Sequence, residues 1–165
     1  LPYKSDCKKW HKDAKTFLDG YNKTFYKRFS KNCNEYFYIP HRNERRGIGG
    51  IFFDNFKQLS LQKTLLLLSD TASQYKNSYI TLAKLRRQKK YTKSQKDFQL
   101  LRRGRYAEFN LVYDRGTAFG LQSNGRIESI LASLPSDVKW SYKKTKEHAA
   151  MEKRLLKFID TDWNA

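Results

Sequence analysis

The sequence contains little cysteine and no long hydrophobic run. Its two cysteines, Cys7 and Cys33, lie far apart without CxxC spacing, which excludes a disulfide framework and a cysteine-based metal site. We therefore expect free buried thiols in a reducing compartment. The longest apolar run is Leu65 to Leu68, whereas a membrane-spanning helix needs roughly 18 apolar residues. No membrane span is expected.

Common catalytic and cofactor motifs are also absent. The chain has no P-loop, no dinucleotide-binding fingerprint, no zinc-protease motif and no nucleophile elbow. The glycines between Gly47 and Gly50 precede an apolar segment instead of opening a helix, which argues against a phosphate cradle. The first residues include neither Met nor an apolar signal segment, so we expect a fragment or a processed product.

Positive charge and aromatic side chains are abundant. Thirty-four Lys and Arg residues against 16 Asp and Glu residues give a formal charge of +18, and 15% of the residues are aromatic. The aromatic content excludes disorder, and 165 residues suffice for one domain with a core. A field of this sign attracts nucleic acid, an anionic membrane or a multiply charged small acid. A lysine-rich composition without any binding role would explain the charge equally well.

Several segments carry hydrophobic residues at helical spacing. The longest stripe follows spacings of four and three residues and consists of Leu61, Leu65, Leu68, Ala72, Tyr75, Tyr79 and Leu82. We expect it to pack against a partner surface, with a coiled coil as the alternative. Thr92 with Gln95 matches a capping box that opens a short helix. The patterns predict helices over 5–19, 23–35, 61–89, 92–101 and 146–160.

Other segments favour strands and hairpins. Apolar and polar residues alternate over 105–113, which is typical of a strand, and Asn124-Gly125 is typical of a hairpin turn. Further strands are expected over 51–54, 119–122 and 127–134, with another turn at 114–117. Together the elements predict an α+β domain with antiparallel strands.

Two of these turns concentrate charge. Asp114-Arg115 follows one predicted strand, and Arg126 opens the next. An arginine at such a position offers a fork of donors that suits a carboxylate, while a structural ion pair between Asp114 and an arginine would tie the turns together. Both interpretations stay open on the residues alone.

A second charged cluster surrounds His41. Its neighbours are Arg42, Glu44, Arg45 and Arg46. The chain has three histidines, His11, His41 and His148, and without acidic help such a set seldom forms a metal site.

Two long segments resemble signatures of one enzyme family. They are Tyr36–Asp54, with the sequence YFYIPHRNERRGIGGIFFD, and Arg102–Thr117, with the sequence RRGRYAEFNLVYDRGT. Both are similar to oxygen-dependent coproporphyrinogen oxidases, and the likeness continues through Phe119–Gln122 and Gly125–Leu131. The resemblance covers essentially the whole chain and matches the C-terminal half of the family, so residues 1–165 would form the C-terminal portion of one domain.

The resemblance implies a fold and a reaction. The fold would be an antiparallel sheet flanked by helices on both faces, in a cytoplasmic homodimer (mitochondrial in a eukaryote) that joins through Tyr106 to Ser141. The substrate would be a porphyrinogen with four carboxylates, and the oxidoreductase would convert two propionates of coproporphyrinogen III to vinyl groups. The reaction uses O2 and yields protoporphyrinogen IX, CO2 and H2O2 in haem biosynthesis, without an organic cofactor.

The resemblance also implies roles for particular residues. Asp114, Arg115 and Arg46 would be catalytic, and Asp114 would face the pyrrole N–H groups. The substrate-binding turn would be Asn124, Gly125 and Arg126, in which Asn124 replaces a glycine of the family pattern. His11 and His41 fall on positions sometimes assigned to a divalent metal, although structural roles are favoured for both.

The rest of the family's catalytic set would lie upstream of Leu1, so we expect this chain alone to be inactive. The alternative function is a truncated, inactive homologue that serves as a basic RNA- or protein-binding module. Intact Asp114, Arg115 and Arg126 argue against that alternative. We expect no specific nucleic-acid partner.

Overall fold

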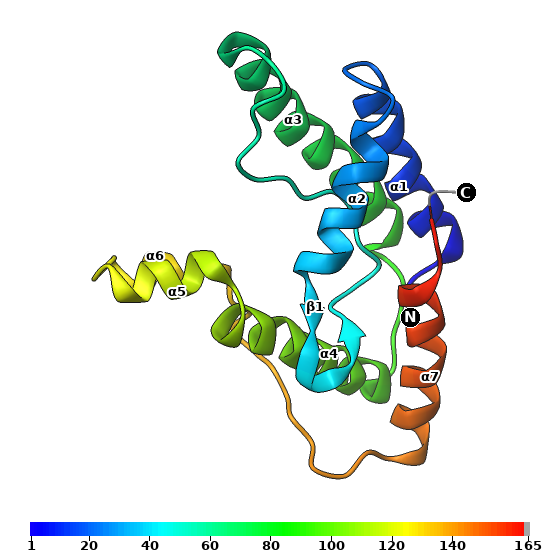
Figure 1. Cartoon of the computed structure of the whole chain (residues 1–165). Coiled ribbons are helices and arrows are strands. Elements are labelled where there is room, and N and C mark those ends of the chain that lie inside the picture. The colour runs from blue at the N-terminus through cyan, green and yellow to red at the C-terminus, as the bar shows by residue number, and fades with distance from the viewer. Residues whose placement is uncertain (164–165) are drawn as a thin grey trace.

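The computed structural model describes residues 1–163 and is mostly helical (Figure 1). The elements are α1 (Lys4–Asp19), α2 (Phe25–Tyr36), β1 (Tyr38–Ile39), η1 (Pro40–Arg42), β2 (Glu44–Arg45), α3 (Leu61–Arg86), α4 (Lys93–Val112), α5 (Arg115–Gln122), α6 (Ile127–Ile130), η2 (Leu131–Ser133) and α7 (Lys146–Asp160). None of the helices in this part of the chain is long and apolar enough to cross a membrane.

The predicted helices at both ends and in the middle of the chain are confirmed, and their start signals explain why. Thr92 and Gln95 form the predicted capping box at the start of α4. Ser60 and Thr145 cap α3 and α7 in the same way, each accepting from a backbone N–H in the first turn. The cysteines are free and buried as expected, and burial raises the pKa of each thiol to about 11.

The predicted strands are wrong. Residues 105–112 belong to α4, which runs to Val112 instead of ending near residue 101, because the capped helix continues through good helix formers such as Arg105, Ala107 and Glu108. The alternation spans only a few residues, and the buried pair Arg105 and Phe109 fits helical i, i+4 spacing equally well. Residues 119–122 and 127–134 are also helical or turn-like, and 51–54 runs without regular structure.

The sheet is therefore much smaller than predicted. Among the described residues it consists of β1 and β2, which pair antiparallel with Tyr38 opposite Arg45 and Ile39 opposite Glu44. Its hairpin contacts α4, and the guanidinium of Arg45 donates to the backbone oxygen of Ile159 in α7. The observed fold is thus a helical assembly with a two-stranded antiparallel ribbon.

An aromatic core holds α1, α2 and the irregular segment 51–56 together. Phe29 is 1% exposed, and its ring stacks on Phe53 at a centroid distance of 4.5 Å and on Phe25 at 5.1 Å. Phe56 packs edge-on against Phe25 and Phe29. Leu18 of α1 belongs to the same cluster. These rings order a segment that has no strand or helix of its own.

Helix α3 packs on α1 with a different face from the one predicted. Leu67 and Ser78 are buried, and Ser78 donates to Asp13 of α1 at 2.6 Å. Most of the leucine and tyrosine stripe is exposed instead, including Leu61, Leu65, Leu68, Tyr75 and Tyr79. The predicted packing of this stripe against a partner surface is therefore not seen among residues 1–163.

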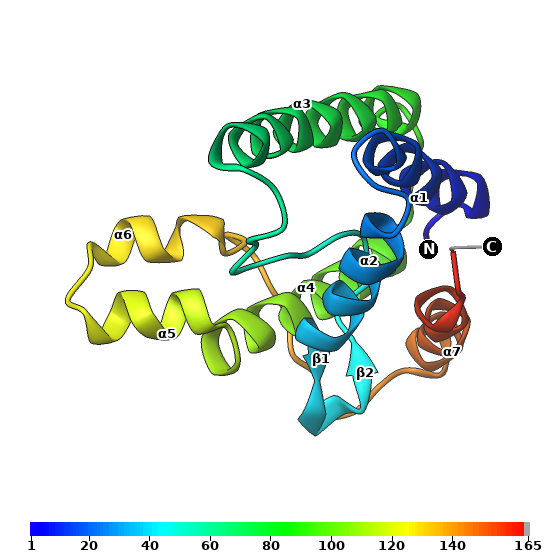
Figure 2. The ribbon, with the colours of Figure 1, turned by 45° about the horizontal axis from the view of Figure 1, so that its top comes forward.

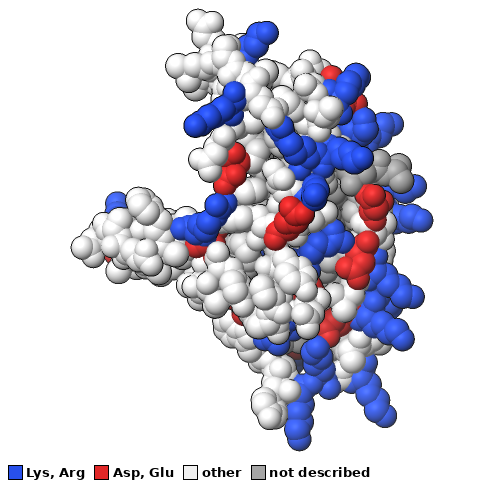
Figure 3. Space-filling model, viewed as in Figure 1, with Lys and Arg blue, Asp and Glu red and all other residues white. Residues whose placement is uncertain are grey.

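Residues 115–130, which we call the arm, project from the body of the molecule. The arm consists of α5, a turn and α6, and it extends to the left of α4 (Figures 1 and 2). Neither of its helices has a buried residue. In Figure 3 its surface is mostly uncharged, while basic side chains gather on the opposite edge of the molecule.

Candidate active site at the base of the arm

Asp114 lies where α4 ends and α5 begins. Its side chain caps α5, and Oδ2 accepts from the Thr117 amide at 2.8 Å and from the Thr117 hydroxyl at 3.0 Å. The other oxygen, Oδ1, accepts from the Tyr36 hydroxyl at 2.9 Å. Burial alone would raise the pKa of Asp114, but these hydrogen bonds and the positive charge of Arg46 lower it below its ordinary value. Asp114 is therefore a firmly ionised carboxylate.

Arg115 does not pair with Asp114. Its guanidinium donates to Asp54 at 2.5 Å and lies over the Tyr36 ring, 4.8 Å from the centroid. Both charged groups are largely exposed, so this ion pair contributes little to stability. Arg115 thus remains at the surface next to Asp114, and its ion pair connects it to segment 51–56 of the aromatic core.

Arg46 lies on aromatic rings. Its guanidinium is 4.1 Å from the centroid of Phe37, 4.7 Å from Tyr106 and 5.1 Å from Phe109. Burial lowers its pKa, while the charge of Asp114 acts in the opposite direction. No ion pair to Arg46 is present among residues 1–163, so its cation is available to an anionic ligand.

A groove of about 550 Å³ runs past Arg46. Its lining includes residues 45–51 and the aromatic side chains of Trp10, Tyr75 and Tyr79. Trp10 also donates to the backbone oxygen of Gly49 at 3.3 Å, which ties the loop to α1. The groove therefore combines aromatic surface with an unpaired cation.

The predicted substrate-binding turn lies at the tip of the arm. Asn124 adopts a left-handed conformation with φ 53°, and the Gly125 amide donates to the Gly120 oxygen at 3.0 Å. A Cβ at Gly125 would lie 2.9 Å from that oxygen, so the close turn requires glycine there. Arg126 is exposed and lies 3.6 Å from Glu128.

The structure consequently brings together only some of the predicted site. Asp114, Arg115 and Arg46 gather around Tyr36 and Phe109, at the base of the arm. Asn124, Gly125 and Arg126 lie at the far end of α5, beyond contact with Asp114 (Figure 2). A ligand that engages both groups would have to lie along the arm or reach the tip of a second arm.

His11 is buried between α1, α2 and the loop after β2. One ring nitrogen, Nδ1, lies 2.8 Å from the Tyr26 hydroxyl, and Nε2 lies 2.9 Å from the Ile48 oxygen. Because a carbonyl only accepts, Nε2 carries the proton and donates to Ile48. Burial lowers the pKa of His11, so the ring is neutral at physiological pH.

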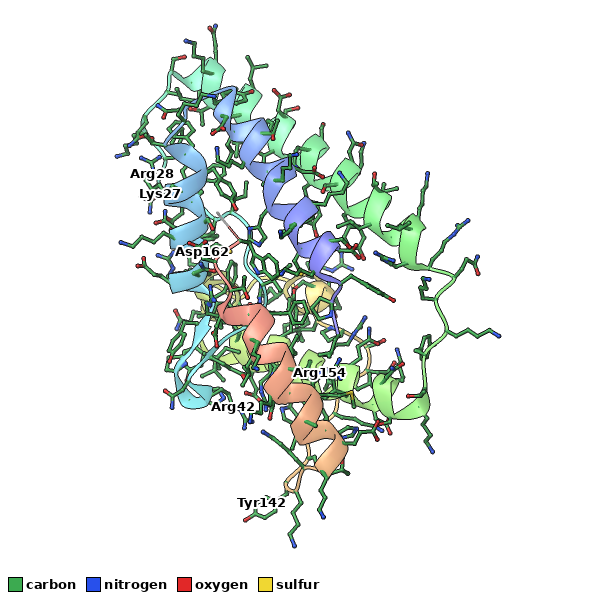
Figure 4. The ribbon with its side chains drawn as sticks, turned by 90° about the vertical axis from the view of Figure 1, so that its right-hand side faces the viewer. Lys27, Arg28, Arg42, Tyr142, Arg154 and Asp162 are labelled. Carbon is green, nitrogen blue, oxygen red and sulfur yellow. The ribbon has the colours of Figure 1, made fainter. Side chains whose placement is uncertain are left out.

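His41 belongs to a separate network around Glu108. Its Nδ1 lies 2.8 Å from the Tyr113 hydroxyl, and its Nε2 lies 2.8 Å from Glu108. Glu108 also accepts from Arg42 at 2.7 and 2.9 Å and from the Trp140 indole at 2.9 Å. In Figure 4 Arg42 lies beside α7, on the side of the hairpin. The network joins the hairpin, α4 and the segment before α7.

These settings bear on the metal assignment of His11 and His41. Both ring nitrogens of each histidine already have hydrogen-bond partners, so neither imidazole, as placed, offers a free nitrogen to a metal. Within residues 1–163, no three His, Cys, Asp or Glu side chains are arranged to hold a metal ion. The geometry fits structural roles for both histidines.

Sequence reasoning missed three residues that organise these clusters: Tyr36, Asp54 and Glu108. Each forms a hydrogen bond with a residue 61 to 79 positions away, so no local sequence pattern predicted the contact. Asp54 and Tyr36 are part of the family-like segment 36–54, which was the one signal available for them.

Comparison with known proteins agrees with the family resemblance. The model of the coproporphyrinogen III oxidase family matches residues 1–164. A protein of Francisella tularensis subsp. holarctica (strain OSU18), named oxygen-dependent coproporphyrinogen-III oxidase, is 46% identical over 163 residues. A protein of the same name from Francisella philomiragia is 44% identical. Each alignment covers 98% of this chain but 53% of the relative, so the chain spans about half the length of these proteins.

Proposed function

The chain belongs to the coproporphyrinogen III oxidase family, and from that premise we propose that it serves the oxidative decarboxylation of coproporphyrinogen III. In this reaction each of two propionates becomes a vinyl group, the carboxyl carbon leaves as CO2, and one O2 per propionate is reduced to H2O2. The products are protoporphyrinogen IX, CO2 and peroxide. The substrate class is a small tetracarboxylate, which suits a chain with a formal charge of +18.

The observation that carries this proposal is that the fixed carboxylate of Asp114 lies near the guanidinium of Arg46, which has no ion-pair partner among residues 1–163. Asp114 is ionised and retains lone pairs on Oδ1 beyond the bond from Tyr36. Such an oxygen can accept pyrrole N–H groups and stabilise the positive charge that develops as electrons pass to O2. Arg46 lies close enough for its charge to lower the pKa of Asp114, and it could bind a propionate from its aromatic platform.

Two further assignments depend on the same family membership. We propose that the apolar stripe of α3 covers part of a larger antiparallel sheet supplied by residues outside this chain, since Leu65, Tyr75 and Tyr79 are exposed. We also propose a homodimer through 106–141, because Phe119, Leu121 and Ile127 expose apolar surface on the arm. The cytoplasmic location and the need for residues beyond these 165 stay predictions.

The test is Asp114→Asn in the full-length protein. Because asparagine caps a helix as well as aspartate does, the melting temperature should change little. Turnover should fall by about 10²-fold or more, because the lost charge acts mainly in the transition state. Asp70→Asn is the matched control, because this exposed aspartate lies on α3 and asparagine can still accept from the Tyr21 hydroxyl. Normal turnover in a folded Asp114→Asn protein would remove Asp114 from the reaction.

Arg126 has its own test. Arg126→Ala should raise KM for the porphyrinogen by about tenfold or more, as expected when a charge-assisted contact is lost. Lysine should rescue only part of the affinity because it lacks the bidentate fork. An unchanged KM would show that the tip of the arm does not bind substrate.

A further inference from the structure

We propose that Tyr36 is a positioning residue for the reaction, which holds the carboxylate of Asp114 and the guanidinium of Arg115 in one fixed arrangement. This inference rests on the proposed function of Asp114. Tyr36 is the last residue of α2, and it lies 78 positions before Asp114 in the sequence.

Tyr36 contacts the Asp114–Arg115 pair in three ways. Its hydroxyl donates to Oδ1 of Asp114 at 2.9 Å. The oxygen of this Tyr36 hydroxyl also accepts from the backbone N–H of Arg115, at 3.2 Å. Its ring lies under the guanidinium of Arg115, 4.8 Å from ring centroid to the central carbon. One side chain thus touches the carboxylate, the backbone and the cation of the pair.

The direction of the Tyr36 proton follows from these partners. A phenol has a single O–H to donate. Since the Arg115 amide can only donate, the hydroxyl oxygen must accept there, and its own proton points to Asp114. The free lone pair of Oδ1 is then held in one direction, which is what a carboxylate needs in order to meet a substrate N–H.

The ring itself has little freedom to move. It stacks on Phe52 with centroids 4.3 Å apart and an interplanar angle of 12°. Phe37 and Phe109 press on it edge-on at 4.9 and 5.6 Å. Packing therefore fixes the phenol independently of its hydrogen bonds, and removal of the hydroxyl alone should leave the ring in place.

The two oxygens of Asp114 have different tasks in this arrangement. Oδ2 caps α5 through the amide and hydroxyl of Thr117. Oδ1 has the Tyr36 hydroxyl as its described partner. Loss of the Tyr36 hydroxyl therefore alters the oxygen that faces substrate and leaves the helix cap intact. Function and stability can be separated at this residue.

A pH profile gives a readout that a purely structural role would not move. The groups that act on Asp114 are Tyr36 from α2, Arg46 after β2, and the first turn of α5. Without the Tyr36 hydroxyl the charged form loses one hydrogen bond, so the pKa of Asp114 should rise. If turnover requires the carboxylate, the acid limb of the kcat–pH profile should then move to higher pH.

The experiment compares Tyr36→Phe with Tyr38→Phe in the full-length protein. Tyr38 is the matched control, because it lies two residues away and, within residues 1–163, its hydroxyl has Asn43 as its hydrogen-bond partner, at 3.5 Å. We expect Tyr36→Phe to lower kcat by about tenfold with KM nearly unchanged, and to shift the acid limb upward. Tyr38→Phe should match the unmodified protein in all three.

The double variant Tyr36→Phe/Asp114→Asn completes the test. If Tyr36 acts through Asp114, the tyrosine change should have no further effect once Asp114 is asparagine. An equal loss in both backgrounds, or a folded Tyr36→Phe protein with normal kcat and acid limb, would overturn the inference. If the Asp114→Asn protein itself turns over normally, the proposed role of Asp114 is wrong, and the inference about Tyr36 is then wrong for that reason.

Discussion

The aromatic core and the arm are held in their conformations by different interactions. Around Phe29, the segment 51–56 has no regular secondary structure, yet stacked rings hold it between α1 and α2. In the arm, α5 and α6 are regular helices, yet Phe119 and Ile127 are exposed. The core is thus fixed by side-chain packing, and the arm by local turn and capping chemistry.

This difference explains how the candidate site is built. Asp114 and Arg115 stand at the junction of the two regions, and Tyr36 and Asp54 reach them from the packed side. The groups proposed to be catalytic are therefore held by contacts from the packed region, while Arg126 lies at the far end of α5. Such an arrangement combines a fixed carboxylate with a surface free to meet a partner.

The largest expected effect compares one phenylalanine from each region. Phe29→Ala should lower the free energy of unfolding by about 3–5 kcal/mol, because the ring is fully buried and contacts three other rings. In a monomer, Phe119→Ala, at a residue 72% exposed, should change it by less than about 0.5 kcal/mol, because only the proposed dimer interface would bury that ring. Denaturant unfolding of both variants measures the contrast. Equal losses would mean that a partner surface covers the arm.

A second contrast concerns ion pairs. Glu108 is mostly buried and accepts from Arg42 and Arg105, whereas Glu128 on the arm is 78% exposed beside an exposed arginine. Glu108→Gln should cost about 2 kcal/mol or more at neutral pH, since it removes the carboxylate that pairs with Arg42 and one of the three carboxylates around Arg105. Glu128→Gln should cost at most a few tenths of a kcal/mol. A small loss for Glu108 would show that water replaces its partners.

The same glutamate gives a pH dependence of defined sign. Burial alone would raise the pKa of Glu108, yet hydrogen bonds from Arg42, His41 and Trp140 and the charge of Arg105 lower it from 4.5 to about 2. Its stabilising contribution is therefore complete above pH 4.5 and is lost as the pH falls towards about 2. Thermal melts across that window should show that the melting temperature falls as the pH is lowered. Glu108→Gln should make this fall smaller, and Glu128→Gln should leave it unchanged.

The third contrast is smaller and concerns the loop that lines the groove. Gly49 has φ +82°, and a Cβ there would lie 2.7 Å from Oδ1 of Asn34. Gly49→Ala should therefore cost about 1–2 kcal/mol through the left-handed conformation, with some added strain from the clash. Gly47→Ala is the control, because a Cβ there meets nothing within 4 Å. Chemical denaturation measures the free energy of unfolding of both variants. Equal values would mean that the loop rearranges freely.

The sequence predicted the helices better than the strands for a physical reason. Caps at Thr92 and Thr145 are local, and the hydroxyls bind backbone amides within three residues. The alternation near Phe109 is short, and it carries no information about whether a capped helix has already begun upstream. Family resemblance located the candidate residues, but their three-dimensional grouping depends on Tyr36 and Asp54, which act over 61 to 79 positions.

The smallest expected effect lies at the tip of the arm. Asn124 has φ 53°, a conformation that asparagine tolerates and glycine adopts without strain. Asn124→Gly relieves that strain but adds freedom to the unfolded chain, so the two effects should nearly cancel, to within about 0.5 kcal/mol. Asn124→Ala keeps the strain without the polar side chain and should cost about 1 kcal/mol. If the turn binds substrate through its backbone, Asn124→Gly should also leave KM unchanged, whereas a raised KM would assign the contact to the asparagine side chain.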